Sequence, residues 1–344
     1  EKVKLFAEGL DAREWAFHTP EKGQKDPLDL HQAFIEFSDI AHLDLNMKAG
    51  RQTFSYGKKR LVAAPVWGNK VRSFDAVLLG VKMKNLESEV FFGSRVIYEE
   101  SGFNKSKWEK VFAGTYNTIT VDAGTLVDVY LLGLVDREND DGRYTLGTRF
   151  NHRKLPGTEI DAEAAWQWGE NQGKEIRAYA GAFYVQKKLE RKFSPQAKLE
   201  ANIASGDRDN TDNADGTFSS LYQAVHGQNG IIDFFRWQNL RELAGVFCIT
   251  LSKQIKAQPE AHWYWLDSGA DAWYRSTGKA LWSNPEYAGN LFAGSEYTLI
   301  VKYTFNRHLK GDAGYSFFHS GNVAGTAGDR DGVHFIYGQA ITVF

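Results

Sequence analysis

Apolar and polar residues alternate along much of this chain with a period of two. Residues 159–169 show the pattern clearly, because the apolar parity includes Trp166 and Trp168 while the other parity carries three carboxylates. In a β-strand the two parities point to opposite faces of the sheet. Residues 143–153 and 296–306 repeat the pattern. The alternation therefore predicts strands with one apolar face and one polar face.

The length of these segments and the position of their aromatic residues separate a membrane protein from a soluble one. A tilted transmembrane strand needs roughly 9–11 residues, whereas strands of soluble proteins average about 5–6 residues. The segments here span about 10–13 residues, and aromatic side chains such as Trp263 and Tyr297 lie near their ends. Aromatic girdles at both interfaces are typical of outer-membrane barrels. A soluble β-sandwich, the alternative, would not place its aromatic residues at strand ends.

We therefore expect an all-β fold, a transmembrane antiparallel up-and-down β-barrel that closes into a ring and forms one domain over residues 1–344. Bacterial barrels have an even number of strands, and we expect about 16, with about 18 as the alternative. Strands are expected at 2–15, 28–39, 42–54, 71–84, 87–99, 111–121, 124–136, 142–153, 158–170, 173–187, 195–205, 239–253, 260–274, 295–306, 308–319 and 333–344. Short turns alternate with long connections, which places both termini in the periplasm. The long outer loops are expected near 55–70, 206–238 and 275–294.

Composition is consistent with this fold and narrows the function. No stretch approaches the roughly 20 apolar residues of a transmembrane helix. The formal net charge of −2 gives no reason to expect nucleic acid as a partner. Cys248 is the only cysteine, so no disulfide can form within the chain, and we interpret it as a small apolar residue. The expected location is the outer membrane of a Gram-negative bacterium.

One stretch of the chain carries a more specific signal than its periodicity. Residues 50–57 read Gly-Arg-Gln-Thr-Phe-Ser-Tyr-Gly, and they are followed by Arg60-Leu61-Val62, Trp67 and Arg72-Ser73-Phe74-Asp75. This stretch resembles the alginate export family of outer-membrane porins. The resemblance implies a monomeric barrel whose polar lumen is narrowed by loops and lined by charged residues. Leu78 departs from the family pattern, in which an arginine usually stands at this position.

The same stretch predicts a charged network at the rim of the pore. Arg51 falls on the lipid-facing parity, and an arginine at the bilayer midplane costs about 2–4 kcal/mol. We expect Arg51 either at the outer rim or turned inward by a bulge at Gly50, and we favour the bulge. The bulge would join four side chains in one ion-pair network: Arg51, Arg60, Arg72 and Asp75. The alternative role of these charges is to hold the loop 55–70 in place.

Sorting the strands by parity gives lumen-facing charges that are nearly balanced between basic and acidic groups. Further candidate pore-lining residues are Lys48, Lys82, Arg95, Arg149, Arg177 and Lys302. Arg149 lies on a strand beside the acidic strand 158–170, which favours cross-strand ion pairs that stiffen the barrel. A transverse field between a basic and an acidic wall is the alternative. Arg72, Arg95 and Lys82, on adjacent strands, are the better candidates for an anion-attracting patch.

The sequence gives no sign of catalytic or metal chemistry. No Ser, His and acid set converges near one strand end, and no two histidines have the spacing of a metal site. The acidic stretch 207–216 lacks the glycine and the late glutamate of an EF-hand loop, so we interpret it as a solvated outer loop. We therefore expect no enzymatic activity, no bound metal and no cofactor.

These observations predict a passive outer-membrane channel for small hydrophilic solutes or anionic saccharides. A barrel of about 16 strands is wide enough for a water-filled pore. The expected partners are the solute, the lipid bilayer and lipopolysaccharide, and the chain is expected to act as a monomer. Two alternatives stay open. One is a dedicated exporter of an anionic polysaccharide, and the other is a plugged barrel that acts as an adhesin or scaffold through its outer loops.

Overall fold

The computed structural model describes residues 2–13, 26–65, 67–68, 71–99, 102–224, 226–284, 286–323 and 332–344. Its strands are β1 (Lys2–Ala12), β2 (Asp26–Ile40), β3 (Leu45–Gln52), β4 (Phe74–Lys82), β5 (Leu86–Ile97), β6 (Lys105–Ser106), β7 (Lys110–Asp122), β8 (Thr125–Asp136), β9 (Asp141–His152), β10 (Thr158–Asn171), β11 (Lys174–Lys188), β12 (Gln196–Ala204), β13 (Ala214–Asp215), β14 (Leu240–Thr250), β15 (Ile255–Trp265), β16 (Trp273–Tyr274), β17 (Ala280–Trp282), β18 (Phe292–Thr304), β19 (Leu309–Ser320) and β20 (Val333–Thr342). No helix in these ranges is long and apolar enough to cross a membrane.

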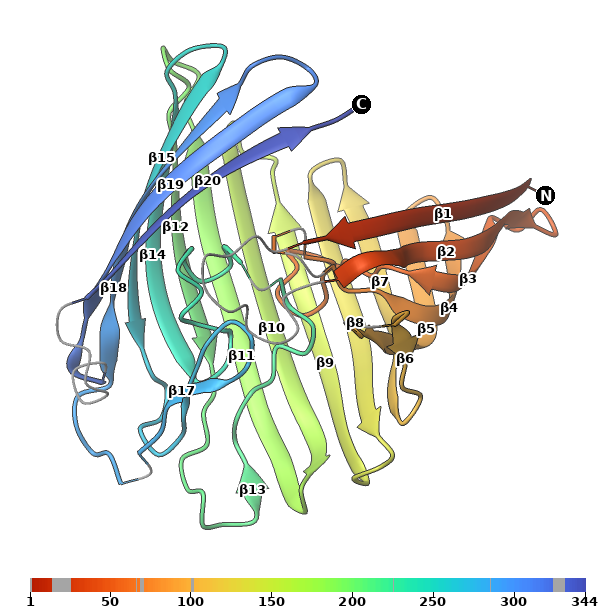
Figure 1. Cartoon of the computed structure of the whole chain (residues 1–344), viewed down its shortest axis with the longest axis horizontal. Coiled ribbons are helices and arrows are strands. Elements are labelled where there is room, and N and C mark those ends of the chain that lie inside the picture. The colour runs from red at the N-terminus through yellow and green to blue at the C-terminus, as the bar shows by residue number, and fades with distance from the viewer. Residues whose placement is uncertain are drawn as a thin grey trace.

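Eighteen of these strands form one sheet in which each long strand pairs antiparallel with the long strands next to it in the chain. Sixteen of the eighteen have eight residues or more, and β6 and β13 have two residues each. In Figure 1 the turns that join β11 to β12 and β14 to β15 lie toward the top, and the long connection that contains β13 lies toward the bottom. We call these the short-turn end and the long-loop end. The predicted all-β, up-and-down architecture is confirmed.

The two edges of the sheet are β1 and β20. Within the described residues β1 pairs with β2, β20 pairs with β19, and no ladder joins β1 to β20. Within the described residues the sheet is strongly curved but does not close into the predicted ring, and β1 and β20 are separate edge strands (Figure 1). Lys2 lies opposite Ser38, and Thr342 lies opposite Leu309, so β1 begins and β20 ends at the short-turn end.

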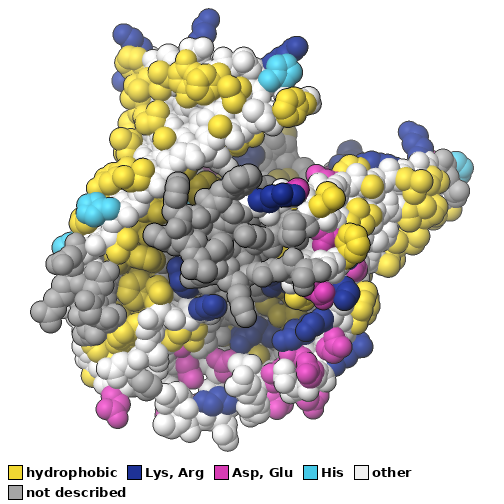
Figure 2. Space-filling model, in the orientation of Figure 1, with side chains coloured by type: hydrophobic (Ala, Val, Ile, Leu, Met, Phe, Trp, Pro, Cys, Tyr) yellow, Lys and Arg dark blue, Asp and Glu magenta, His cyan; other side chains and the backbone are white. Residues whose placement is uncertain are grey.

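Alternation along the strands separates a lipid-facing surface from an inward-facing one. On β10 the side chains of Trp166 and Trp168 are 51% and 38% exposed, whereas Asp161 and Gln167 are fully buried. The same division holds on β9 and on β18, where Leu299 faces outward. Figure 2 shows apolar side chains spread over the outer faces of the wall. The parity predicted for these three strands is confirmed.

Two long connections fold back into the space that the sheet encloses. The described parts of residues 53–73 and 205–239 meet where Val62 and Tyr222 form an isolated bridge. The backbone N–H of Ala63 also donates to the carbonyl of Tyr222 at 2.9 Å. Both connections leave the wall at the long-loop end, but they line the lumen instead of extending away from it. We call them the first and the second inward loop.

The hydrophobic core of the molecule lies between these loops and the wall. Phe54 of the first inward loop packs on Phe91 of β5 with ring centroids 4.7 Å apart. Phe235 of the second inward loop stacks on Tyr264 of β15 at 3.9 Å. Aromatic pairs of this kind contribute about 0.5–1.5 kcal/mol beyond the burial of their surface. The core therefore holds both loops in fixed positions across the lumen.

Candidate functional site

A chain of buried ion pairs runs along the inner wall. Arg149 on β9 pairs with Asp128 on β8 and with Asp161 on β10, with N–O distances of 2.9 Å in each case. Arg60 of the first inward loop contacts Asp161 at 3.3 Å and Glu163 at 2.8 Å. All five residues are buried, and a buried charge is tolerated where it is paired. The predicted cross-strand ion pairs are confirmed, and they leave Arg60 and Arg149 with neutralised charges.

Three arginines surround a cavity of about 260 Å³ at the long-loop end of the lumen. Arg72 precedes β4, Arg95 lies on β5, and Arg236 belongs to the second inward loop. Among the described residues, no aspartate or glutamate lines this space, and none of the three arginines forms an ion pair. We call it the arginine cavity. It brings together Arg72 and Arg95, which the sequence predicts as an anion-attracting patch.

Neutral groups hold these guanidinium groups in place. Arg72 Nη1 donates to the carbonyl of Ala63 at 2.9 Å, and Arg236 Nε donates to the hydroxyl of Ser220 at 2.6 Å. The Nε atoms of Arg72 and Arg95 are buried without a hydrogen-bond partner. Carbonyl and hydroxyl oxygens orient a guanidinium without cancelling its charge. The described lining of the arginine cavity therefore carries a net positive charge.

The pKa values of Arg72 and Arg236 are also affected by burial and by the positive charge of the neighbouring Arg95. Burial, followed by repulsion from Arg95, lowers the pKa of Arg72 to about 10. Burial and Arg95 likewise lower the pKa of Arg236 to about 10. Both Arg72 and Arg236 belong to the inward loops rather than to the strands. An anion in the cavity would oppose these effects, because an opposite charge stabilises the ionised form of a base.

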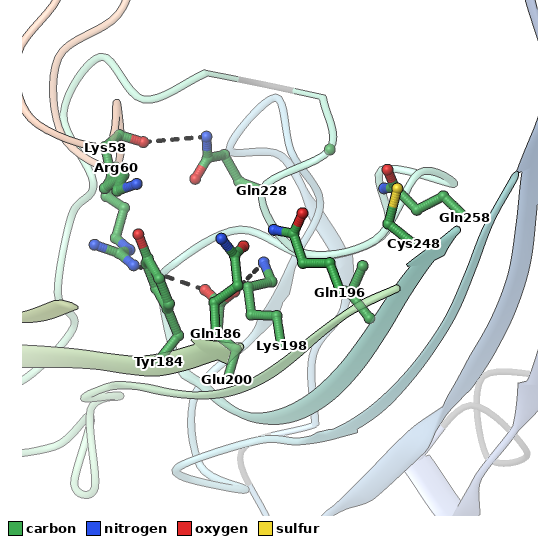
Figure 3. Close-up of a pocket in the computed structure, with 12 residues that line it drawn as sticks. Lys58, Arg60, Tyr184, Gln186, Gln196, Lys198, Glu200, Gln228, Cys248 and Gln258 are labelled. Atoms are coloured by element: carbon green, nitrogen blue, oxygen red, sulfur yellow. Dashed lines mark hydrogen bonds and ion pairs between the residues drawn. The ribbon is translucent and has the colours of Figure 1, made fainter. Parts of the chain in front are cut away.

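A second cavity, of about 330 Å³, lies at the short-turn end, and we call it the inner cavity. Figure 3 shows its lining of amide, basic, acidic, phenolic and thiol side chains from the wall and from both inward loops. Lys58 pairs with Glu159 at 3.1 Å, and Lys198 pairs with Glu200 at 2.6 Å. The inner cavity is therefore polar with paired charges. Cys248, expected as a small apolar residue, lines this polar space.

Arg51 and Asp75 lie on the outward-facing parity and not in the lumen. They are direct partners in the β3–β4 ladder, whose register runs from Leu45 to Gln52 without a shift, so the predicted bulge at Gly50 is absent. Arg51 Nε donates to Asp75 Oδ1 at 2.8 Å, and Arg51 Nη2 donates to the carbonyl of Asn104 at 3.0 Å. These partners accept hydrogen bonds from the guanidinium of Arg51 on the outer face, so the side chain does not have to turn into the lumen to find a partner.

The predicted network of four charges is therefore wrong. Arg60 belongs to the buried ion-pair chain, and Arg72 belongs to the arginine cavity. Lys48 lines a further cavity of about 370 Å³ at the short-turn end. Lys82 is exposed beside a glutamate at the end of β4, which separates it from the predicted anion patch. Lys302 lies opposite an aspartate of β19, near the short-turn end.

The prediction that Arg177 lines the pore is wrong. On β11 the buried parity carries Ile176 and Ala178, whereas Arg177 and Tyr179 are exposed on the outward face. Arg177 pairs there with Glu175 at 2.5 Å, close to the long-loop end. A charge near the membrane interface costs little, about 0–1 kcal/mol for an arginine. The strand therefore keeps its small residues inside, where the second inward loop packs against them.

Arg236 is the functional candidate that sequence reasoning missed. It lies within 206–238, which the sequence predicts as a long outer loop. One signal was present, since Phe234, Phe235 and Trp237 surround Arg236 in a short aromatic run. Such a run is expected to be buried, and burial would carry the arginine into the lumen with it.

Comparisons with known proteins agree with this architecture. The family model described as alginate export matches residues 1–337. No curated protein matches the chain. Similar solved structures come from Pseudomonas aeruginosa. OccK3 (OpdO) has 12% identity and a TM-score of 0.62, with 94% of this chain and 82% of that chain covered. OccD3 (OpdP) has 11% identity and a TM-score of 0.60, with 92% and 78% covered.

The outer membrane protein OprD of the same organism is also similar, with 11% identity, a TM-score of 0.57, and 91% of this chain and 78% of that chain covered. At such identities the likeness concerns the fold, which is that of outer-membrane β-barrels. The lipid-facing rows of apolar side chains fit the same setting, and the family acts in transport rather than in catalysis. With a family model that spans nearly its whole length, the chain belongs to the alginate export family and is an outer-membrane β-barrel channel protein.

Proposed function

We propose that the chain is a passive channel for small hydrophilic solutes that favours anions, and that it acts as a monomer with one domain over residues 1–344. The observation that carries this proposal is the arginine cavity, in which three guanidinium groups face one space whose described lining contains no carboxylate. Charges of one sign between low-dielectric walls concentrate the field and raise the local concentration of oppositely charged solutes. A guanidinium also presents paired donors that match a carboxylate.

Selectivity of the current tests this proposal. Purified protein in a planar bilayer under a KCl gradient should give an ohmic current whose reversal potential reports a preference for chloride. Arg95→Gln should lower that preference severalfold, because Arg95 contributes charge to the cavity without holding a loop carbonyl. Arg95→Lys keeps the charge and should keep the preference. Arg177→Gln removes one positive charge from the outward face and should change nothing.

Two results would contradict the proposal. One is the absence of an ohmic current from folded protein in the bilayer. The other is an unchanged or cation-favouring reversal potential in which Arg95→Gln behaves like the parent chain. The first result would favour the plugged barrel, an adhesin or scaffold, which is supported by the way both inward loops occupy the lumen.

Export of an anionic polysaccharide is the second candidate, and the family match favours it. A polymer needs a continuous open path, so export requires the inward loops to move. Efflux of labelled anionic oligosaccharides of increasing length from proteoliposomes separates the two functions. A diffusion channel should show a sharp decline with length, whereas an exporter should pass long chains at a rate that depends weakly on length.

A further inference from the structure

A very small cavity, of about 10 Å³, lies between the arginine cavity and the inner cavity, and we call it the neck. The neck shares Gln223 with the arginine cavity, and it shares Arg60, Glu200 and Gln228 with the inner cavity. The three spaces therefore adjoin one another in sequence from the long-loop end to the short-turn end. Of these three cavities, the neck has the smallest volume.

Three buried polar atoms in the lining of the neck have no hydrogen-bond partner. They are Asn202 Oδ1 on β12 and, on the second inward loop, Asn229 Oδ1 and Trp237 Nε1. The three residues are only 7%, 5% and 2% exposed. An unpaired buried polar group destabilises a fold by about 1–3 kcal/mol. The three residues line one small cavity, so a polar ligand in that cavity would satisfy them.

Glu242 on β14 determines which way both amides point. Asn202 Nδ2 and Asn229 Nδ2 each donate to Glu242 Oε2, at 2.8 Å and 2.6 Å. The other oxygen, Oε1, lies 2.8 Å from His262 Nδ1. An ionised carboxylate accepts hydrogen bonds and does not donate them, so an amide flip would set oxygen against oxygen. The two amide oxygens are therefore fixed away from Glu242.

One donor and two acceptors define the chemistry of the ligand. It must accept a hydrogen bond from the indole N–H of Trp237 and donate to two carbonyl oxygens. A carboxylate or a halide has no proton to donate, and an ammonium group has no lone pair to accept. A hydrogen phosphate can do both, but it is too large for a cavity of about 10 Å³. Water does both, and a site for one water needs about 10–15 Å³ and two to four polar partners.

We propose that Trp237, Asn202 and Asn229 bind a single water molecule in the neck and that this hydrated neck is the closed point of the solute path. The inference rests on the proposed channel function and deepens it. Anions gather in the arginine cavity, but a solute larger than water passes to the inner cavity only when the second inward loop moves.

The native thiol of Cys248 is a reporter for this closure, because it lines the inner cavity beyond the neck. A small anionic methanethiosulfonate reagent is added to one side of a planar bilayer that holds oriented protein, and the rate of thiol modification is measured. In the parent chain, modification should be fast from the short-turn side and at least tenfold slower from the long-loop side. Trp237→Ala should make both rates similar by opening the neck.

Two substitutions serve as controls. Trp237→Phe keeps an aromatic ring in the neck but removes the donor, so modification from the long-loop side should stay slow. Trp166→Ala removes an equal side chain from the lipid-facing wall and should also leave it slow. If Trp237→Ala does not fold, Gln228→Ala widens the neck from its inner side and should raise the same rate. Equal rates from both sides in the parent chain would overturn the proposal.

A crystal structure at a resolution that defines water molecules tests the ligand itself. One water within hydrogen-bond distance of Trp237 Nε1 and of both amide oxygens is expected, and Trp237→Phe should lose or displace it. An empty neck would overturn the proposal, as would the hydroxyl of a bound polyol in place of the water. Failure of the channel proposal looks different, because the chain would then carry no current while Cys248 still showed one-sided modification.

Discussion

A side chain on Gly230 would collide with Glu296, since an ideal Cβ at this glycine would lie 2.2 Å from Glu296 Oε2. Glu296 also accepts hydrogen bonds from the backbone N–H groups of Ile231 at 2.7 Å and Ile232 at 3.3 Å. The second inward loop therefore sits on β18 with its backbone against the wall. Asn229, which lines the neck, is the residue directly before this contact.

Gly230→Ala should displace the second inward loop around residue 230 from its contact with Glu296. Single-channel recordings should then show larger or more frequent conductance fluctuations. Gly227→Ala is a matched control, because both glycines have a positive φ, +81° and +71°, but a Cβ at Gly227 meets nothing within 4 Å. The strain of a positive φ is thus common to both variants, and the collision belongs to Gly230 alone. Identical recordings for the two variants would contradict the proposal that close packing of Gly230 against Glu296 holds the second inward loop in place.

Arg149→Met should destabilise the folded barrel by roughly 3–5 kcal/mol, because it leaves the buried Asp128 and Asp161 without their shared partner. Urea-induced unfolding in lipid vesicles, followed by heat-modified gel mobility, measures the change. Arg177→Met is the control, since its ion pair with Glu175 is exposed to solvent, and its midpoint should match the parent chain. Equal midpoints for both variants would show that the buried ion-pair chain does not stabilise the wall.

Brominated lipids quench the fluorescence of tryptophans that contact the bilayer. Trp166 is 51% exposed on the outer wall and should be quenched, whereas Trp237 is 2% exposed in the lumen and should not be. Trp166→Phe should therefore reduce the quenched part of the emission, and Trp237→Phe should reduce only the unquenched part. A quenched Trp237 would mean that the second inward loop lies outside the barrel.

Arg51→Leu should loosen the segment around β6, because Arg51 contacts both Asp75 and the carbonyl of Asn104. Chymotrypsin cleavage after Phe103, which is 74% exposed, should then become faster. Lys105→Ala removes a nearby exposed charge and should leave the cleavage rate unchanged. Unchanged cleavage in Arg51→Leu would show that the salt bridge does not anchor this segment.

The alternation of apolar and polar residues predicted the strands of the wall well, because successive side chains of a barrel strand point in turn to the lipid and to the lumen. The boundaries of β15 show where this reasoning fails. The expected strand 260–274 starts too late, since Pro259 suggests a turn but instead pairs with Leu299 inside β15. It also ends too late, because the chain leaves the wall after Trp265 and Asp267 binds Arg241 at 2.8 Å. Such tertiary contacts have no signature in local periodicity.

The candidate site was predicted only where its residues lie on or beside strands. Arg72 and Arg95 could be paired from their neighbouring positions in the sheet. Arg236, Asn229 and Trp237 could not be placed, because the return of a long loop into the lumen depends on contacts with distant wall residues. Arg51 was misassigned for the same reason, since the segment that satisfies it lies far away along the chain.

The contact between the two inward loops also has a consequence for folding. Arg72 donates to the carbonyl of Gln223, which is 151 positions away along the chain. Contacts between residues so distant in sequence form slowly, because a large loop must close before they stabilise anything. Glu296 on β18 completes the support of the same loop. We therefore expect the sheet to assemble first, and the filling of its interior to be the last and slowest event in the maturation of this protein.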